Sequence, residues 1–333
     1  MTREDIQDYA VNLTNKYHNV IYELATGLGK SLIAIRIIEK FGGNWKIVIA
    51  ETNHEQNWIN EFNKHGKESL LPNVEFLCYQ SLKHHLDGDN YVFDEVHHLT
   101  SVLRLELISQ VSVKRFVGLS ATLTRTQKDS IRSVIGEFHI YKVPLSEAID
   151  LGILPEPTVY FVQVPLDNVH KTYKYFFNKD KWTYCTEQQK YAYMSARIEY
   201  LKNRYFMSNR EVDKTFWLKA ANERKKFLSE VKTPHAARLL NKIGDRKLLC
   251  FTGSIEQSEF LSNGLSIHSK IPKKKRTELI ERFNNGDIRQ LFATGMLKEG
   301  INLPSIEVGL VIQLDNVERY FVQVTGQVRP LSL

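Results

Sequence analysis

The sequence lacks long hydrophobic runs and contains few cysteines. No apolar stretch approaches the ~20 residues that a helix needs to cross a bilayer, so we expect no membrane-spanning segment. Residues 1–9 include acidic side chains and lack the apolar core of an export signal. Cys78, Cys185 and Cys250 lie far apart, which fits neither a disulfide framework nor the spacing of zinc ligands. We therefore expect buried free thiols and a cytoplasmic, reducing location.

The bulk composition is ordinary for a globular protein, with 42% hydrophobic and 25% charged residues. A chain of 333 residues suits two domains better than one. The net charge is +7 and the isoelectric point is about 9.1. This positive excess permits a polyanionic partner, but a basic face that is merely solvated would give the same total.

A glycine-rich loop, ATGLGKS at 25–31, separates two apolar segments near the N-terminus. Residues 20–22 form a short β-favouring run that predicts a buried strand. The pattern of residues 31–41 predicts a mostly buried helix that stops at the glycine pair 42–43. Strand, glycine loop and helix are the context of a phosphate-binding loop. The alternative is a purely structural glycine turn before a buried helix.

The residue types in this loop fit a nucleoside triphosphate. Gly27 and Gly29 let the backbone adopt conformations in which successive N–H groups face an anion, and the helix start adds free N–H donors. Lys30 would reach the β- and γ-phosphates, and the Ser31 hydroxyl would bind Mg²⁺. A strict motif has Gly at the position of Leu24, so this loop is a variant. The residues expected to bind the nucleotide here are Thr26, Gly27, Gly29, Lys30 and Ser31.

A glutamine precedes the loop by one short helix-compatible segment. The side-chain amide of Gln7 offers both a donor and an acceptor, so it can bind both polar edges of adenine. A surface glutamine without such a role is the default alternative.

Two carboxylates follow a predicted buried strand at 91–93. At the end of such a strand, Asp94 can bind the Mg²⁺ that Ser31 also binds, and Glu95 can orient or deprotonate the attacking water. Paired acids can instead simply cap a turn. Adjacent histidines do not share a face, so we interpret His97 as a hydrogen-bonding coupler rather than a metal ligand.

Small hydroxyl residues follow three further predicted strands. Thr52 and Ser81 stand where they can bind phosphate oxygens of a nucleic acid, although such residues more often cap loops. Ser120 and Thr122 can sense the cluster around Asp94 and His97 and relay its state.

The segments ATGLGKS, DEVH and SAT, in this order, resemble motifs I, II and III of the superfamily 2 DExH helicases. Residues 141–154 resemble the exit from the first domain in the branch that contains phage annealing helicases and restriction-enzyme motor subunits. The resemblance implies two RecA-like α/β domains with parallel sheets, ATP in the cleft between them, and nucleic acid across their outer face.

The C-terminal part extends the resemblance. The turn at 252–255 follows a predicted strand at 247–251 and resembles motif IV, and the segment 294–304 matches motif V. Residues 323–330, QVTGQVRP, align with motif VI, in which an arginine reaches the γ-phosphate. Gln327 occupies the first arginine position and cannot supply that charge, which leaves Arg329 as the candidate. The resemblance assigns nucleic-acid contacts to Thr252 and Thr294, and positions near the nucleotide to Glu299 and Gly300.

Aromatic and basic residues alternate from His170 to about Val231, with few acids between them. Such a mixture can stack bases and neutralise phosphates. The alternative is an ordinary helical insert with aromatic side chains inward and lysines outward, and for any one aromatic residue a core position is the favoured interpretation, since large aromatic side chains are usually buried.

We therefore predict an N-terminal RecA-like ATP-binding domain at 1–157, a connector and mainly helical insert at 158–235, and a C-terminal RecA-like domain at 236–333. The resemblance implies an ATP- and Mg²⁺-dependent helicase or translocase, with DNA favoured over RNA and little sequence preference. Two alternatives stay open: a nucleic-acid clamp or annealing module with weak ATPase activity, or a motor subunit of a restriction or defence complex with a separate protein partner. The predicted catalytic residues are Lys30, Asp94, Glu95 and Arg329, and the predicted metal ligands are Ser31 and Asp94.

Overall fold

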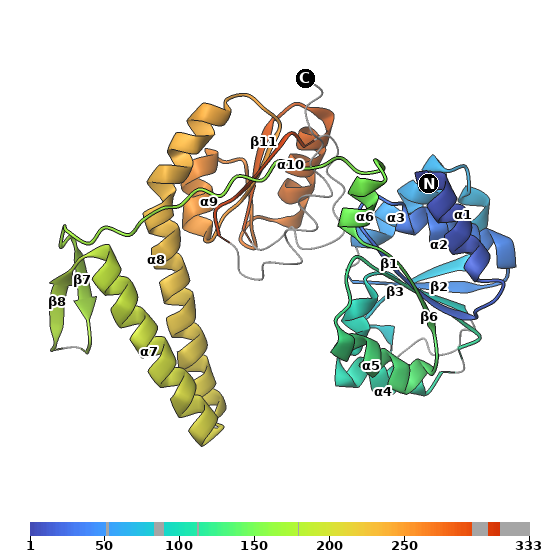
Figure 1. Ribbon diagram of the computed structural model, residues 1–333, viewed down its shortest axis with the longest axis horizontal. Coiled ribbons are helices and arrows are strands. Elements are labelled where there is room, and N and C mark those ends of the chain that lie inside the picture. The colour runs from blue at the N-terminus through green and yellow to red at the C-terminus, as the bar shows by residue number, and fades with distance from the viewer. Residues whose placement is uncertain (51–52, 83–89, 112, 179, 295–305, 314–333) are drawn as a thin grey trace. The chain divides into compact units, whose positions relative to one another are not determined.

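The chain folds as two compact units in the computed structural model, which describes residues 1–50, 53–82, 90–111, 113–178, 180–294 and 306–313 (Figure 1). The first unit comprises Met1–Pro157, and the second contains the described residues from Thr158 onward. Each unit has its own parallel sheet.

The first unit is a six-stranded parallel sheet with strand order β3-β2-β4-β5-β1-β6. Its strands are β1 (Asn19–Leu24), β2 (Trp45–Ile49), β3 (Val74–Cys78), β4 (Asn90–Phe93), β5 (Arg115–Ser120) and β6 (His139–Val143). Its helices are α1 (Arg3–Leu13), α2 (Lys30–Phe41), α3 (Asn53–Lys64), η1 (Glu68–Asn73), η3 (Val96–Thr100), α4 (Val102–Ser109), α5 (Arg125–Ile135) and α6 (Leu145–Asp150).

Both faces of this sheet are covered, which explains why its strands are apolar without alternation. Successive residues of a strand point to opposite faces, and in β1 the side chains of Val20 and Tyr22 join one core cluster while Ile21 joins the other. The first cluster includes isoleucines of α2, and the second includes Ile108 of α4 and Ile131 of α5. Strands buried on both faces read as continuous hydrophobic runs, so the predicted parallel α/β fold is confirmed.

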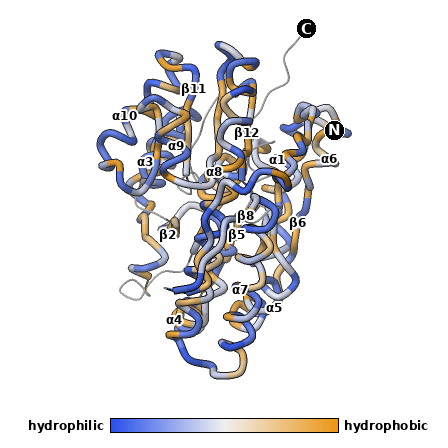
Figure 2. Tube along the Cα trace, turned by 90° about the vertical axis from the view of Figure 1, so that its left-hand side faces the viewer, coloured by the Kyte–Doolittle hydropathy of each residue, from blue (hydrophilic) through white to orange (hydrophobic). Residues whose placement is uncertain are grey.

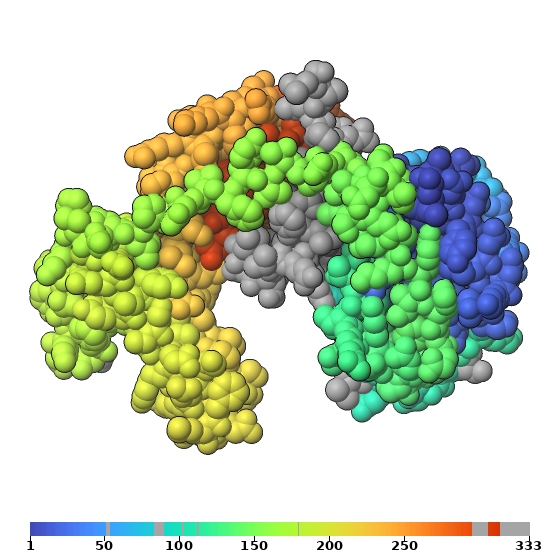
Figure 3. Space-filling view, viewed as in Figure 1, coloured from blue at the N-terminus to red at the C-terminus, as the bar shows by residue number. Residues whose placement is uncertain are grey.

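The second unit contains a four-stranded parallel sheet with order β10-β11-β9-β12 and a two-stranded antiparallel ribbon, β7-β8. The strands are β7 (Tyr173–Phe176), β8 (Trp182–Cys185), β9 (Leu248–Phe251), β10 (Ser266–Ile267), β11 (Gln290–Ala293) and β12 (Val308–Val311). The helices are α7 (Glu187–Ser208), α8 (Glu211–Ile243), α9 (Ile255–Ser262) and α10 (Lys273–Asn285). The ribbon lies at the surface of the unit (Figure 3).

Helices α7 and α8 form a long antiparallel hairpin in which hydrophilic and hydrophobic residues are interspersed (Figure 2). The turn between them is fixed by Asp213, whose carboxylate accepts hydrogen bonds from Ser208 (2.6 Å) and Arg210 (3.1 Å) and pairs with Arg204 at 2.6 Å. The hydrogen bond from Ser208 and the two arginines lower the pKa of Asp213. The predicted insert is therefore mainly helical, with the β7-β8 ribbon as an unforeseen addition.

Helix α8 runs without interruption through Pro234 and across the predicted boundary at 235–236. Its C-terminal half packs Ala236 and Leu240 against Leu248, Cys250 and Phe292 of the second sheet. The approach is closest at Gly253, where a Cβ atom would lie 2.2 Å from Ser229 Oγ. The insert and the second sheet thus share one helix, because the residues that end the insert are also core residues of the sheet domain.

Two smaller expectations have clear outcomes. All three cysteines are free, with Cys185 and Cys250 buried and Cys78 partly buried. Among the described residues, no helix has the length and apolar character required to span a membrane. The basic run at 273–276 forms the first turn of α10.

Candidate active site

The predicted motifs of the first unit converge at the carboxyl edge of its sheet. Strands β4, β5 and β1 are neighbours and run parallel, so the residues that follow them meet at the same edge. The glycine loop follows β1, Asp94 and Glu95 follow β4, and Ser120 ends β5. Sequence-distant motifs are therefore brought together by strand order alone.

The glycine loop has the conformation that an anion-binding turn requires. Gly27 and Gly29 have φ angles of 94° and 86°, a region that favours glycine. Helix α2 begins at Lys30, and its N-cap, Gly29, provides no side-chain cap. The first N–H groups of a helix have no intrahelical acceptor, so this helix start offers free donors to a phosphate.

Two predicted nucleotide-binding residues lie against this loop. Lys30 Nζ donates a hydrogen bond to the Leu24 carbonyl at 3.1 Å. Gln7 is buried, and its Nε2 donates to the Leu28 carbonyl at 3.0 Å. A Cβ atom at Gly29 would lie only 2.4 Å from that Nε2. Gln7 is therefore part of the loop's packing rather than a free surface glutamine.

Asp94 is partly buried beside several polar groups. The indole Nε1 of Trp58 donates to Asp94 Oδ2 at 3.0 Å. Removal from water raises the pKa of Asp94 and the adjacent Glu95 raises it further, while the Trp58 hydrogen bond, His54 and Lys30 act in the opposite direction. A bound divalent cation would also stabilise the ionised form of Asp94. The protein groups around Asp94 alone leave that ionised form destabilised, as its raised pKa indicates.

Glu95 has an unusual backbone conformation, with φ and ψ of 50° and 58°. A left-handed conformation is costly for a residue other than glycine and often marks a functional turn. His97 Nδ1 lies 3.3 Å from Glu95 Oε2 and 3.4 Å from Ser120 Oγ. Ser120 Oγ in turn donates to the Thr122 carbonyl at 2.9 Å. The structure therefore connects Glu95 to the residues that follow β5, as a coupling role for His97 requires.

Three residues at this edge were not recognised from the sequence. His54 and Trp58 lie one turn apart on α3, and Tyr79 donates from its hydroxyl to the Asp94 carbonyl at 3.0 Å. Nδ1 of the buried His54 has no hydrogen-bond partner within the described ranges. The sequence signal for this pair was the i, i+4 spacing of His54 and Trp58, which makes them neighbours on a helix. A tryptophan in an amphipathic helix is, however, typical of a core residue.

The hydroxyl residues predicted to bind nucleic acid differ in their surroundings. Ser81 Oγ donates to the Cys78 carbonyl at 3.0 Å and accepts from the Cys78 N–H, so it closes its own turn. In the second unit, Thr252 is buried, and its Oγ1 lies 2.6 Å from that of the partly exposed Thr294. Thr252 therefore supports Thr294 and is not itself presented to a ligand. Thr52, Glu299, Gly300 and Arg329 lie outside the described residues.

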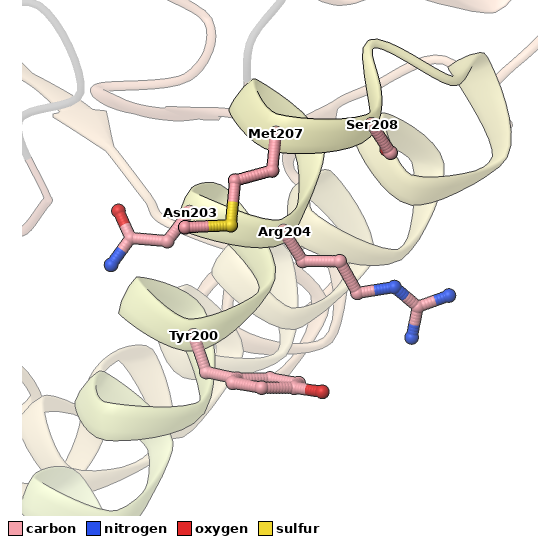
Figure 4. Close-up of a pocket in the computed structure, with 5 residues that line it drawn as sticks. All are labelled: Tyr200, Asn203, Arg204, Met207 and Ser208. Atoms are coloured by element: carbon pink, nitrogen blue, oxygen red, sulfur yellow. The ribbon is translucent and has the colours of Figure 1, made fainter.

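A surface pocket of about 400 Å³ lies elsewhere, on α7 of the second unit (Figure 4). None of the predicted site residues lines it. Its lining residues are Tyr200, Asn203, Arg204, Met207 and Ser208.

The donor set at the first sheet fits Mg²⁺ together with a nucleoside triphosphate. Ser31 and Asp94 supply a hydroxyl and a carboxylate, the hard oxygen donors that Mg²⁺ prefers. Within the described ranges, no group of three or more His, Cys, Asp or Glu side chains is arranged to hold a metal ion.

Comparisons with known proteins agree with this architecture. Residues 231–329 match the family model described as helicase conserved C-terminal domain. The DNA 3'-5' translocase XPB2 of Sulfurisphaera tokodaii is 22% identical to the chain, with 97% of the chain and 77% of that protein covered. The Rad25 protein of Haloarcula marismortui is 24% identical, with 93% of the chain but only 47% of that protein covered.

A solved structure gives the same result for the fold. The helicase domain of Hef from Pyrococcus furiosus has a TM-score of 0.51 at 14% identity and covers 98% of this chain and 93% of its own. With the motif order at the sheet edge and the C-terminal domain match, these similarities support the resemblance of the chain to superfamily 2 helicases.

Proposed function

We propose that the chain is an ATP-dependent DNA translocase or helicase whose catalytic residues lie at the carboxyl edge of the first sheet. The observation that carries the proposal is the placement of Lys30, Asp94 and Glu95 after β1 and β4, the two parallel strands that flank β5. Lys30 is also close enough to Asp94 to lower its pKa. An ammonium group, a metal-binding carboxylate and a second carboxylate at one edge are what phosphoryl transfer requires.

Each residue at the edge has a distinct role in this proposal. Free N–H groups at the start of α2 and the Lys30 ammonium hold the β- and γ-phosphates, while Ser31 and Asp94 hold Mg²⁺. When bound, Mg²⁺ neutralises charge that develops on the phosphate oxygens. Glu95 orients the attacking water and accepts its proton. Gln7 lies on the loop where its amide can bind adenine.

Hydrolysis needs a physical link to the rest of the motor. The contacts from Glu95 to His97 and from His97 to Ser120 supply such a link within the first unit. A change in the charge or position of Glu95 during the reaction alters the His97 hydrogen bonds, and Ser120 passes the change to the segment after β5. Glu299, Gly300 and Arg329 complete the proposed nucleotide site by resemblance.

The proposed nucleic-acid contact in the second unit is Thr294, supported by Thr252. Thr52 is the corresponding candidate in the first unit, whereas the Ser81 hydroxyl is used within its own turn. The XPB2 relative is named a DNA 3'-5' translocase, which favours DNA as the substrate. Contacts mainly to phosphates carry little sequence information and weaken with salt, so we propose largely sequence-independent binding.

The decisive test is DNA-stimulated ATP hydrolysis by a Lys30→Ala variant. Loss of the ammonium should reduce turnover by about a hundredfold or more, since charge stabilisation at the reacting phosphate is lost. Lys64→Ala, which removes an exposed lysine of α3, is the matched control and should retain full activity. Lys30→Ala turnover equal to that of the control would refute the assignment.

A second candidate is a DNA clamp or annealing module with weak turnover. It is favoured by Gln327, which stands at an arginine position of motif VI in the sequence. Gln327→Arg should then increase ATPase activity, because an arginine at the γ-phosphate contributes orders of magnitude to the rate. Unchanged activity would count against this explanation. A third candidate, a motor subunit of a larger complex, predicts co-purification with a separate protein.

A further inference from the structure

The β7-β8 ribbon has two chemically different faces. Residues on one face of a strand alternate with those on the other, and the register pairs Tyr173 with Cys185 and Phe176 with Trp182. Tyr175 and Cys185 are buried on the inner face. The outer face carries four exposed side chains: Lys174, Phe176, Trp182 and Tyr184.

The inner face of the ribbon packs on the helical hairpin. The Tyr173 ring meets Phe227 of α8 edge-on at 5.3 Å, and the Tyr175 ring lies 5.2 Å from Tyr193 of α7. An isolated two-stranded ribbon is marginal in water, and these contacts supply the missing partner.

The outer face forms a continuous aromatic surface around one ammonium group. Phe176, Trp182 and Tyr184 remain 53%, 46% and 55% exposed. The rings of Trp182 and Tyr184 lie 5.5 Å apart at 90°, and Lys174 Nζ is 3.7 Å from the Trp182 ring centroid. Three large aromatic side chains exposed together are unusual on a protein surface and indicate a binding site.

The charge of this region favours a polyanion. Residues 171–226 hold 14 of the 45 lysines and arginines but only 6 of the 38 aspartates and glutamates. This segment therefore carries a formal charge of +8, and the rest of the chain carries −1. The entire positive excess of the protein lies in the ribbon and the helical hairpin behind it.

We propose that the outer face of the β7-β8 ribbon binds single-stranded DNA by stacking unpaired bases on Phe176, Trp182 and Tyr184. Rings that every base can stack on, next to cations that neutralise phosphates, are the features of sequence-tolerant single-strand sites. A protein partner would also cover apolar side chains, but it does not account for the charge excess. The proposal deepens the proposed function by naming a single-strand contact for the motor.

The ribbon is connected to the second sheet through α8. It packs on α8 through Phe227, and two residues further on Ser229 accepts a hydrogen bond from Gln257 at its carbonyl (2.7 Å). Gln257 also accepts from the Gly253 N–H at 2.9 Å, in the turn that follows β9. A DNA strand bound to the ribbon would therefore be connected through α8 to the turn after β9, beside Thr252 and Thr294.

The test compares binding of the full chain to labelled oligothymidylate and to an abasic strand of equal length. Both probes carry the same phosphates, but only the first can stack. Trp182→Ala should weaken oligothymidylate binding about tenfold and change abasic binding by less than about twofold. Trp182→Phe retains a ring and should bind nearly as well as the wild type. Phe260→Ala, at another exposed aromatic residue of the same unit, is the matched control.

Two outcomes would overturn the proposal. Equal binding of oligothymidylate by Trp182→Ala and Phe260→Ala would show that the ribbon stacks no bases and leave a protein partner as its occupant. Equal weakening for both probes would show that Trp182 affects folding or phosphate contacts and not base stacking. Unchanged thermal unfolding of Trp182→Ala would then assign the effect to phosphate contacts, for example those of Lys174. Lys30→Ala distinguishes single-strand binding by the ribbon from the proposed ATPase function. This variant should keep its preference for oligothymidylate over the abasic strand whether or not ATP hydrolysis survives.

Discussion

The two parallel sheets present different chemistry at equivalent edges. The first sheet ends in ionisable side chains, with Lys30, Asp94 and Glu95 following its central strands. The second ends in neutral hydroxyls, with Thr252 after β9 and Thr294 after β11. The same strand geometry therefore presents ionisable groups at one edge and neutral hydroxyls at the other.

This difference has an energetic consequence. Removal from water and the negative charge of Glu95 both disfavour the ionised form of Asp94 and raise its pKa. The Thr252–Thr294 pair, in contrast, satisfies its hydroxyls internally and at the Ser254 carbonyl. We conclude that the charged side chains at the first edge reduce the stability of the folded protein, whereas the hydroxyls at the second edge have most of their hydrogen bonds without a ligand.

The sharpest test of this contrast is Asp94→Asn. Loss of a metal ligand should reduce ATPase activity by about a hundredfold or more. In metal-free buffer at neutral pH the same change should raise the unfolding midpoint by about 3 °C, the shift expected for roughly 1 kcal/mol. The stability gain follows because the amide does not repel Glu95.

The pH dependence of that gain has a definite sign. A raised pKa means that the folded state binds the Asp94 proton more tightly than the unfolded state does. The wild type therefore loses stability as the pH rises through this pKa, and the advantage of Asp94→Asn should disappear as the pH falls below it. Asp129→Asn, at an exposed ion pair with Arg132, should show neither effect. A variant less stable than the wild type at neutral pH would contradict the argument.

Trp58→Phe should have the next largest effect, because it removes the indole donor to Asp94. Partners that orient a metal ligand typically contribute about 10- to 100-fold to metal affinity or activity. We expect a higher Mg²⁺ requirement in ATPase assays and an acidic limb of the pH profile displaced to higher pH, since the Trp58 hydrogen bond lowers the pKa of Asp94. Trp217→Phe in the helical hairpin is the control; an unchanged Mg²⁺ titration for Trp58→Phe would remove Trp58 from the site.

Thr294→Val tests the neutral edge of the second sheet. A hydrogen bond to a charged phosphate contributes about 1.5 kcal/mol or more, so DNA binding should weaken about tenfold. ATP hydrolysis without DNA should be unchanged. Thr252→Val should weaken binding less, because Thr252 acts through Thr294. A stronger effect at Thr252 than at Thr294 would reverse the assigned roles.

Ser81→Ala is expected to have the smallest effect. Its hydroxyl already closes the turn after β3 through the Cys78 backbone, so its loss should cost about 1 kcal/mol of stability and leave DNA binding unchanged. Fluorescence anisotropy with duplex and single-stranded DNA measures this directly. If Ser81→Ala weakened DNA binding without changing stability, Ser81 would again be a candidate for the phosphate contact that the sequence suggested.

Much of the first unit was predictable because its signals are local. The glycine loop needs residues that tolerate positive φ, and the presence of Gly27 and Gly29 in the sequence indicates such a loop. The strand before Asp94 is apolar without alternation, as a doubly covered strand must be. In contrast, Trp58 resembles any core aromatic residue in the sequence, and only the fold brings its indole on α3 to Asp94, the residue that follows β4.

The insert shows the opposite limit. Its aromatic and basic composition allowed two interpretations, and the structure contains both: Tyr175 is buried, whereas Phe176 is half exposed one residue later. The boundary predicted at 235–236 lies inside α8, because Ala236 and Leu240 continue the helix while packing on the second sheet. Composition does not reveal which face of a strand meets a neighbour.

The sequence by itself determined the order of the motifs and the residue types at each strand end, since these depend on local backbone preference and hydrophobic pattern. Tertiary structure alone decided which of those ends became neighbours, which hydroxyls were buried, and which side of the ribbon stayed in solvent. The reason is that burial and proximity are set by packing between segments far apart in the chain, and no local pattern carries that information.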